Sequence, residues 1–182
     1  GSDRLTDARD DCTPVERIFG WRHATVMRYS IPMPLHPEPI YFYAQTDPYA
    51  EFSNFAPYGV AFDGTWWRTV ERYFQAMKFH DADHRERIRR SHKPKAAKAL
   101  GMTRAIPLRA DWEEVKDDIM LTAVRCKFQT HAGPRQLLLS TGEARLVENA
   151  PMDAYWGCGP DGRGLNKLGQ ILMTVRLELS GN

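Results

Sequence analysis

Apolar and polar positions recur with a helical period between Trp66 and Phe79. The apolar positions are three or four residues apart, at Val70, Tyr73, Phe74 and Met77. Thr69 lies directly before them and is a favourable N-cap residue. A second set with the same period is polar and consists of Glu71, Gln75 and Lys78. The pattern predicts a helix that begins after Thr69 and carries a polar stripe beside its buried face.

Short extended segments precede this helix. Ile40–Ala44 is apolar and aromatic, which is typical of a strand. Tyr58–Phe62 and Thr65–Arg68 flank Asp63-Gly64, a dipeptide that strongly favours a two-residue hairpin turn. We therefore expect the helix to leave the end of a hairpin, which would fix the position of Glu71.

More helices are predicted downstream, together with one further strand. The predicted helices are His84–Arg90, Lys95–Leu100, Asp111–Gln129, Pro134–Leu139 and Asn166–Leu179, and the candidate strand is Ala144–Glu148. The longest helix begins with a capping-box-like Asp111-Trp-Glu-Glu114, and its apolar stripe is wide enough to pack on more than one side. The pattern as a whole predicts an α+β fold, mainly helical, with a small antiparallel sheet.

The first part of the chain differs in character. It is mixed in charge and then rich in proline, so we expect an extension with a short helix near Val15–Phe19, followed by an extended linker. Gly1-Ser2 resembles a cloning scar and carries no fold information. We place the extension and linker at residues 1–39 and a single catalytic domain at residues 40–182, which is an ordinary size for one domain.

Composition narrows the class of protein. Apolar residues make up 42% of the chain, which is typical of a globular protein, and no apolar run approaches the ~20 residues that a membrane span needs. Cys12, Cys126 and Cys158 are few and odd in number, so we expect a reducing, cytoplasmic setting. The net charge of +2 is too small to indicate nucleic-acid binding by itself.

Two carboxylates stand out as candidates for catalysis. Glu71 falls in the first turn of the predicted helix, where the dipole favours an ionised carboxylate, although it could serve only to complement that dipole. Asp153 lies beside Tyr155 and Trp156, which could stack a base, as could Trp112. Paired carboxylates near aromatic residues are typical of a glycosidic hydrolase, whose transition state is oxocarbenium-like.

Other patterns have both a functional and a structural interpretation. A glycine-rich loop, with Gly157 and Gly159, leads into a helix near Asn166 and could bind a pyrophosphate through backbone N–H groups, or could be a tight connector. The basic run 85–98 could meet phosphates or could be a solvated face. His80 and His84 lack the glutamate of an HExxH motif, so we expect no metal site and no cofactor.

Several separated motifs resemble those of the YbiA-like, or NADAR, family. In chain order they are EFSNF (51–55), the 67–79 segment with its core TVERYFQAMKF, WEEVK (112–116), Lys127-Phe128, DAYWG (153–157) and NKLGQILM (166–173). They occur in the family's order from about Tyr41 to Arg176. The resemblance implies a YbiA-like fold and metal-independent hydrolysis of an N-glycosidic bond.

The resemblance also implies roles for individual residues. Glu71 matches the glutamate of the family's VEHYFQ motif, with Arg72 where histidine is usual, and Asp153 matches the aspartate of its DxxWG motif. Arg72 would alter the rim of the pocket. Glu71 would activate water or stabilise the ribosyl cation, and Asp153 would assist proton transfer or orient the ribose. The substrate-binding candidates are Asn54, Trp67, Lys78, Trp112, Tyr155, Trp156, Gly157, Gly159 and Asn166.

Three functions are compatible with these residues. The glycine-rich loop and the basic run favour a hydrolase that removes ADP-ribose from guanine in nucleic acid, so the expected partner is ADP-ribosylated nucleic acid or a small molecule that contains ADP-ribose. The alternative in the same class is an N-glycosidase that acts on phosphoribosylated pyrimidine intermediates of riboflavin synthesis. A non-catalytic reader of ADP-ribose or nucleic acid is the third, but a reader would not need paired carboxylates. No membrane partner is expected.

Overall fold

The computed structural model describes residues 38–181, all of which belong to one compact unit. The predicted helix near Val15–Phe19 and Cys12 lie outside the described residues. The boundary between an extension and a catalytic domain at residues 39 and 40 therefore stays a prediction.

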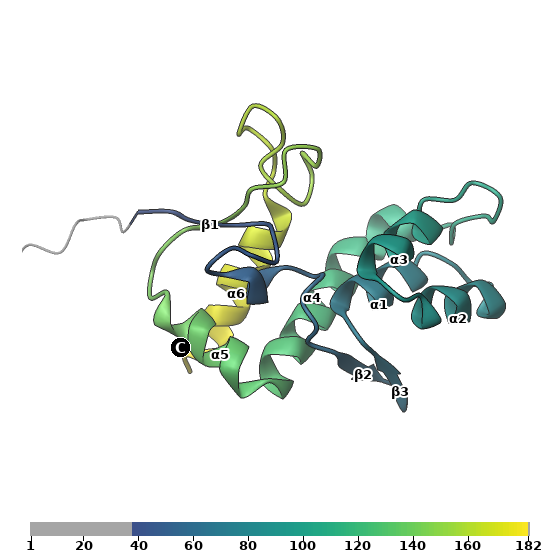
Figure 1. The fold of residues 1–182 in the computed structure, drawn as a ribbon, viewed down its shortest axis with the longest axis horizontal. Coiled ribbons are helices and arrows are strands. Elements are labelled where there is room, and N and C mark those ends of the chain that lie inside the picture. The colour runs from purple at the N-terminus through teal and green to yellow at the C-terminus, as the bar shows by residue number, and fades with distance from the viewer. Residues whose placement is uncertain (1–37, 182) are drawn as a thin grey trace, which may run out of the picture. The chain divides into compact units, whose positions relative to one another are not determined.

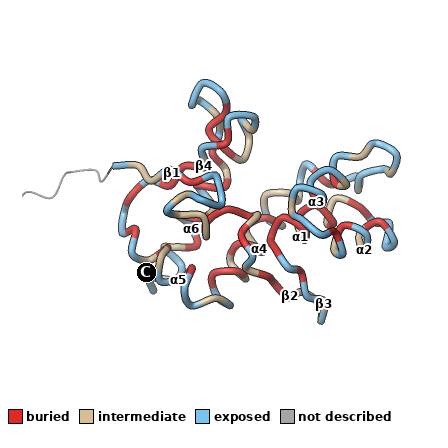
Figure 2. Tube along the Cα trace, viewed as in Figure 1, coloured by how far each residue is buried: buried red, intermediate tan, exposed pale blue. Residues whose placement is uncertain are grey.

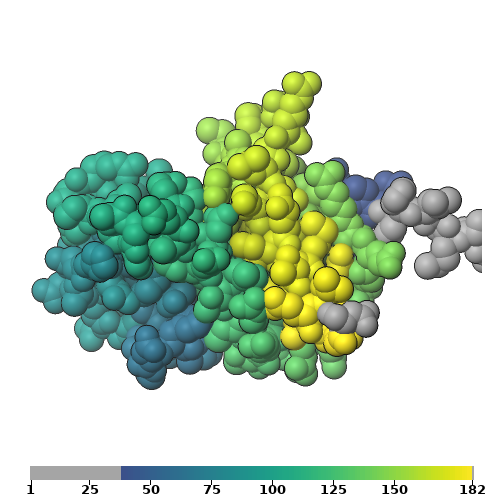
Figure 3. All heavy atoms as spheres, turned by 180° about the vertical axis from the view of Figure 1, so that it is seen from behind, coloured from purple at the N-terminus to yellow at the C-terminus, as the bar shows by residue number. Residues whose placement is uncertain are grey.

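Helix α4 (Trp112–Thr130) lies at the centre of the fold (Figure 1). It packs against α1 (Val70–Ala76), α5 (Ala132–Ser140), α6 (Lys167–Leu179) and strand β2 (Val60–Phe62). The space-filling view shows α6 in yellow on one side of this helix and the teal α2–α3 region on the other (Figure 3). The prediction of a central helix that packs on more than one side is confirmed.

Helices α2 (Ala82–Arg90) and α3 (Pro94–Gly101) pack on α1. The approach of α3 is so close that a Cβ atom at Gly101 would lie 1.9 Å from Gln75 Oε1. Arg72 connects α1 to the segment between α2 and α3, since its guanidinium donates to the carbonyls of Ser91 (2.9 Å) and His92 (2.9 Å). Arg72 is buried and does not line the pocket, so the expectation that it alters the pocket rim is wrong.

Two small sheets lie among residues 38–181. Strand β2 pairs antiparallel with β3 (Thr65–Trp67), and the turn between them has positive φ at Asp63 (49°) and Gly64 (73°), as the hairpin prediction requires. Strand β1 (Ile40–Phe42) pairs in parallel with β4 (Leu146–Glu148), and Phe42 lies opposite Glu148. A short 3₁₀ helix, η1 (Ala50–Phe52), follows β1.

The predicted α+β, mainly helical fold class is confirmed, with one of its two strand pairs parallel rather than antiparallel. Buried residues follow α1, α4 and α6, and the loops are largely exposed (Figure 2). Among residues 38–181, no helix has the length and apolar character needed to cross a bilayer.

The start of α4 differs from the prediction. Asp111 makes no side-chain capping hydrogen bond. Its carboxylate instead accepts from Arg109 Nε (2.6 Å) and Nη2 (2.8 Å). The predicted capping box is therefore wrong, because a neighbouring guanidinium competes for the carboxylate.

Candidate active site

The polar stripe of α1 faces a cleft of about 250 Å³. Glu71 and Gln75 of α1 line it, and so does Lys78, which lies just beyond the end of the helix. The remaining lining residues come from other segments and are Asn54, Phe55, Phe74, Lys98, Met102, Met120, Glu148, Asp153 and Trp156. The structure thus places both predicted catalytic carboxylates, Glu71 and Asp153, in one cleft.

Glu71 is buried at the start of α1 and is held from two sides. Its backbone N–H donates to the Asn54 carbonyl (3.1 Å), and Gln75 Nε2 donates to Glu71 Oε1 (2.8 Å). Burial raises the pKa of Glu71, while the Gln75 hydrogen bond and the charges of Lys98 and Lys78 act in the opposite direction. Contrary to the expectation from the helix dipole, desolvation is the larger influence on this carboxyl.

Glu148 is a third carboxyl in the cleft, and the sequence did not single it out. It is the last residue of β4, where its N–H donates to Asn166 Oδ1 (2.9 Å). Burial raises the pKa of Glu148 to about 7, and the charges of Asp153 and Glu71 add to this effect. A carboxyl with such a pKa can hold and release a proton near neutral pH. No local pattern in the sequence indicates Glu148 as a site residue, because its place in the cleft depends on the pairing of β4 with β1.

Asp153 is oriented by the loop that follows β4. Its Oδ1 accepts hydrogen bonds from the backbone N–H groups of Tyr155 (3.1 Å) and Trp156 (2.8 Å). These two bonds fix the carboxylate and occupy one oxygen, so Oδ2 is the oxygen that can reach a ligand.

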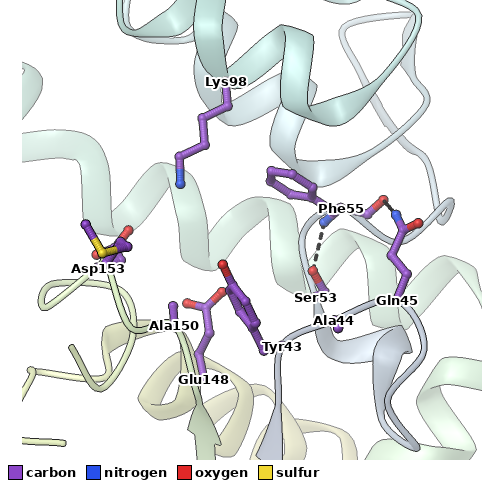
Figure 4. Close-up of a pocket in the computed structure, with 10 residues that line it drawn as sticks. Tyr43, Ala44, Gln45, Ser53, Phe55, Lys98, Glu148, Ala150 and Asp153 are labelled. Atoms are coloured by element: carbon purple, nitrogen blue, oxygen red, sulfur yellow. Dashed lines mark hydrogen bonds between the residues drawn. The ribbon is translucent and has the colours of Figure 1, made fainter. Parts of the chain in front are cut away.

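A second cleft, of about 260 Å³, adjoins the first. It is lined by Tyr43, Ala44, Gln45, Ser53, Phe55, Lys98, Glu148, Ala150, Met152 and Asp153. Phe55, Lys98, Glu148 and Asp153 line both clefts, so they mark the junction between them. Figure 4 shows the Lys98 side chain extending from α3 toward Glu148 and Asp153.

Two lysines bring positive charge to the carboxylates. Lys78 Nζ donates to the Gly101 carbonyl (3.4 Å) and lies 5.7 Å from the centre of the Phe74 ring. Burial lowers the pKa of Lys78, and the charge of Glu71 raises it. Lys98 is exposed on α3 and belongs to the predicted basic run, so part of that run faces the cleft. In the same run Glu86 pairs with Arg89 (2.6 Å), which is the solvated-face arrangement.

The predicted aromatic residues divide between the cleft and the core. Trp156 lines the cleft. Trp112 is buried behind it, with its ring 5.1 Å from that of Phe74. Trp67 lies in the core, 5.6 Å from the Tyr73 ring. Neither Trp67 nor Trp112 is among the residues that line the two clefts, and of the two only Trp112 packs on a ring, that of Phe74, that does.

Tyr155 faces α4 rather than the cleft. Its hydroxyl donates to Asp117 Oδ1 (2.7 Å), whose other oxygen pairs with Lys167 (2.9 Å). Lys116 Nζ lies 4.0 Å from the centre of the Tyr155 ring. This cluster attaches the loop that carries Asp153 to the central helix, so Tyr155 acts on the site through that loop.

The amides at the start of α6 are used by the glycine-rich loop for its own hydrogen bonds. The N–H groups of Asn166, Lys167 and Leu168 donate to loop carbonyls of Gly157 (3.0 Å), Tyr155 (3.1 Å) and Trp156 (3.1 Å). Gly159 has φ of 69°, and its N–H donates to the Asp153 carbonyl (3.2 Å). These amides are therefore not available to a pyrophosphate, because the loop uses them to close on itself.

Asn166 has a structural task at the same place. It has a left-handed backbone (φ 52°), and its side chain accepts from Glu148 N–H and donates through Nδ2 to the Leu146 carbonyl (2.9 Å). Gly157 allows this closeness, since a Cβ there would lie 2.9 Å from the Glu148 carbonyl. Asn166 and Gly157 thus position Glu148 and do not line either cleft.

Only His84 of the histidine pair is used in packing. His84 is buried, with its ring 4.5 Å from that of Phe79 and Nε2 3.2 Å from the Leu100 carbonyl, and His80 is exposed. Within the described part of the chain, no group of three or more His, Cys, Asp or Glu side chains could hold a metal ion.

Comparisons with known proteins match this geometry to one family. The NADAR domain matches residues 41–180. The N-glycosidase YbiA of Escherichia coli is 49% identical over 141 residues, which cover 78% of this chain and 88% of that protein. The NMR structure of YbiA superposes with a TM-score of 0.74 at 46% identity and covers 83% of this chain and 90% of that one. The chloroplastic riboflavin biosynthesis protein PYRR of Zea mays is 40% identical over 157 residues, or 78% of this chain and 25% of its own length.

Proposed function

Because this chain belongs to the NADAR domain family and is an N-glycosidase of the YbiA kind, we propose that its substrate is ADP-ribosylated guanine in nucleic acid. The reaction hydrolyses the bond between C1′ of the ribose and a nitrogen of the base and releases ADP-ribose. The observation that carries the proposal is the cluster of Glu71, Glu148 and Asp153 at adjoining clefts, with Lys78 and Lys98 beside it.

Glu71 acts on the ribose. It lines only the first cleft, and Gln75 fixes one of its oxygens. As the C1′–N bond breaks, positive charge develops on the ribose, and a carboxylate held nearby stabilises that charge. The same carboxylate takes a proton from the water that adds to C1′.

Glu148 supplies the proton for the leaving base. It lies at the junction of the clefts, and the pKa of about 7 leaves a large protonated fraction at neutral pH. The electron pair of the broken bond goes to the base nitrogen, which takes the proton from Glu148. This role extends the pair of carboxylates expected from the sequence to three.

Asp153 orients the ribose. One of its oxygens accepts from the Tyr155 and Trp156 amides, and the other can accept from a ribose hydroxyl. Among the described residues, Asn54 Oδ1 and Gln75 Oε1 are buried without a hydrogen-bond partner. Asn54 lines the first cleft, so a ribose hydroxyl that reaches its Oδ1 would satisfy it, whereas Gln75 Oε1 lies against Gly101 of α3.

The distribution of charge supports ADP-ribose over a ribose with a single phosphate. Lys78 and Lys98 line the first cleft, and Arg104 is close enough to lower the pKa of Lys78. A pyrophosphate and a single phosphate monoester carry similar charge. The pyrophosphate spreads that charge over two phosphate groups, so it can contact cations on separate segments at the same time. Since the glycine-rich loop has no free amides for an anion at the start of α6, these side chains carry the argument for ADP-ribose.

The second candidate function is hydrolysis of phosphoribosylated pyrimidines from riboflavin synthesis. The similarity to PYRR of Zea mays favours it. The same three carboxylates would serve that reaction, because the scissile bond is again N-glycosidic. The two substrates differ in the phosphate and base groups that the clefts must hold.

Mass spectrometry of released ADP-ribose tests the proposal. The wild-type protein, with a chelator present, is incubated with an oligonucleotide that carries ADP-ribose on guanine. We expect release by the wild type and a loss of about 10²–10⁴-fold in Glu71→Gln, which keeps the size of the side chain but cannot take a proton. Glu114→Gln is the matched control, because Glu114 lies in the first turn of α4 and is exposed.

Each other outcome has a distinct meaning. Release from a phosphoribosylated pyrimidine alone would favour the second candidate. Tight binding of ADP-ribose with no release from either substrate would indicate a non-catalytic reader. Full activity of Glu71→Gln would show that the roles assigned to the three carboxylates are wrong.

A further inference from the structure

We infer that the second cleft is the subsite for the leaving nucleobase, with Tyr43 and Phe55 as its stacking surfaces. The inference rests on the proposed function, because it takes the bond at the carboxylates to be N-glycosidic. No residue of this cleft outside the junction had a role in the sequence-based predictions. The inference deepens the proposed function because it assigns one part of the substrate to each of the two clefts.

The carboxylates fix where the reacting bond lies. Glu148 and Asp153 line both clefts, and Glu71 lines only the first. The ribose must lie beside Glu71 and Asp153, so the group on the other side of the C1′–N bond extends past Glu148 into the second cleft. That group is the base.

The two clefts differ in the chemistry of their walls. Lys78 lines only the first, so the first is better suited to phosphates. The second offers large apolar side chains at its edge: Tyr43 is 50% exposed and Met152 is 93% exposed. Exposed aromatic rings at a cleft edge are suited to stacking on a base.

Polar groups in the second cleft can read the edge of a base. Gln45 Nε2 donates to the Phe55 carbonyl (3.3 Å), which leaves the amide oxygen of Gln45 as an acceptor. The Phe55 N–H donates to Ser53 Oγ (3.2 Å), so the aromatic wall is fixed by its own backbone (Figure 4). A planar ring with N–H groups therefore finds both a stacking surface and an acceptor.

The test compares Tyr43→Ala with Tyr43→Phe and with Tyr41→Ala. Tyr41 is 56% exposed on β1 but is not among the residues that line this cleft, so it controls for loss of a surface tyrosine. Removal of a stacking aromatic should raise the KM for the ADP-ribosylated oligonucleotide by about 5- to 100-fold. Tyr43→Phe keeps the ring and should stay within about 2-fold of wild type on the same reasoning.

Binding of free ADP-ribose separates the two clefts. Calorimetry should give the same Kd for wild type and Tyr43→Ala, because the product has no base in the second cleft. An equal loss of ADP-ribose affinity in Tyr43→Ala would overturn the inference, since the cleft would then hold part of ADP-ribose. An unchanged KM would overturn it as well.

Failure of the proposed function is distinguishable from failure of the inference. If the wild type released no ADP-ribose, the substrate would be wrong, and the same three variants would be assayed on a phosphoribosylated pyrimidine. A selective KM increase for Tyr43→Ala on that substrate would still support a base subsite. If Tyr43→Ala did not raise the KM for the substrate that is cleaved, the inference of a base subsite would be overturned.

Discussion

Replacement of Glu148 by glutamine should make the protein more stable at alkaline pH. The pKa of Glu148 is raised from 4.5 to about 7 in the folded protein, chiefly by burial. Between these pH values the folded protein keeps a proton that the unfolded chain loses. The free energy of unfolding therefore falls as the pH rises through this window, and the full penalty is present above pH 7.

The magnitude follows from the size of the pKa change. One pKa unit corresponds to about 1.4 kcal/mol, so the change from 4.5 to about 7 at Glu148 corresponds to about 3.5 kcal/mol at most. The side chain is only partly buried, at the edge of two clefts, and water there reduces the penalty. Glu148→Gln carries no charge at any pH, so we expect it to be about 1–3 kcal/mol more stable than wild type at pH 8.

Urea unfolding at pH 5 and pH 8, followed by tryptophan fluorescence, measures the difference. At pH 5 the variant and wild type should be close in stability, and the gap should open by pH 8. Glu114→Gln, on the surface of α4, should change little at either pH. The reasoning is refuted if Glu148→Gln changes stability equally at both pH values or is less stable at pH 8. The same variant should lose about 10²–10⁴-fold in kcat, since it has no proton to give.

Two further substitutions test the supports of the site. Burial lowers the pKa of Lys127 to about 7. Between pH 7 and 10.5 only the unfolded chain keeps the proton, so the free energy of unfolding of the wild type should rise with pH in this window. Lys127→Met should flatten that rise in urea titrations. Above pH 10.5, where the lysine is neutral in the folded and unfolded states, Lys127→Met should cost about 1–3 kcal/mol, because Lys127 Nζ donates to the buried Ser53 carbonyl (2.9 Å). An equal pH slope in both proteins would contradict this account. Gly101→Ala places a Cβ on Gln75 Oε1, so it should displace the partner of Glu71 and lower kcat at least about tenfold, whereas Ala99→Gly on the exposed side of α3 should not. Unchanged kcat in Gly101→Ala would show that Gln75 does not position the carboxylate.

The parts of the fold that sequence predicted are those with local signals. Thr69 accepts from the Arg72 N–H (3.2 Å) and begins α1 where a capping residue should. Asp63-Gly64 forms the expected turn, and the stripe of Glu71 and Gln75 follows from helical spacing alone. In each case the residues that decide the structure are within a few positions of one another.

The parts that were missed depend on contacts between distant segments. Glu148 is at the site because β4 pairs with β1, and no local pattern shows that pairing. Lys127 is buried in the last turn of α4, and its burial depends on the Ser53 segment, because lysines are rarely buried without such a partner. The amides before α6 were expected to be free, but their partners in the loop cannot be read from glycine spacing.

The parallel pairing of β1 with β4 also has a consequence for synthesis on the ribosome. Strand β1 cannot pair with β4 until residues up to Glu148 have left the ribosome. The pairing then closes a loop that contains α1, α2, α3, α4 and α5. A nascent chain can build Glu71 into α1 long before it has the other two carboxylates. On the proposed mechanism, catalysis begins only when nearly the whole domain has been translated and folded, so we expect a chain interrupted after α5 to be inactive however well its helices form.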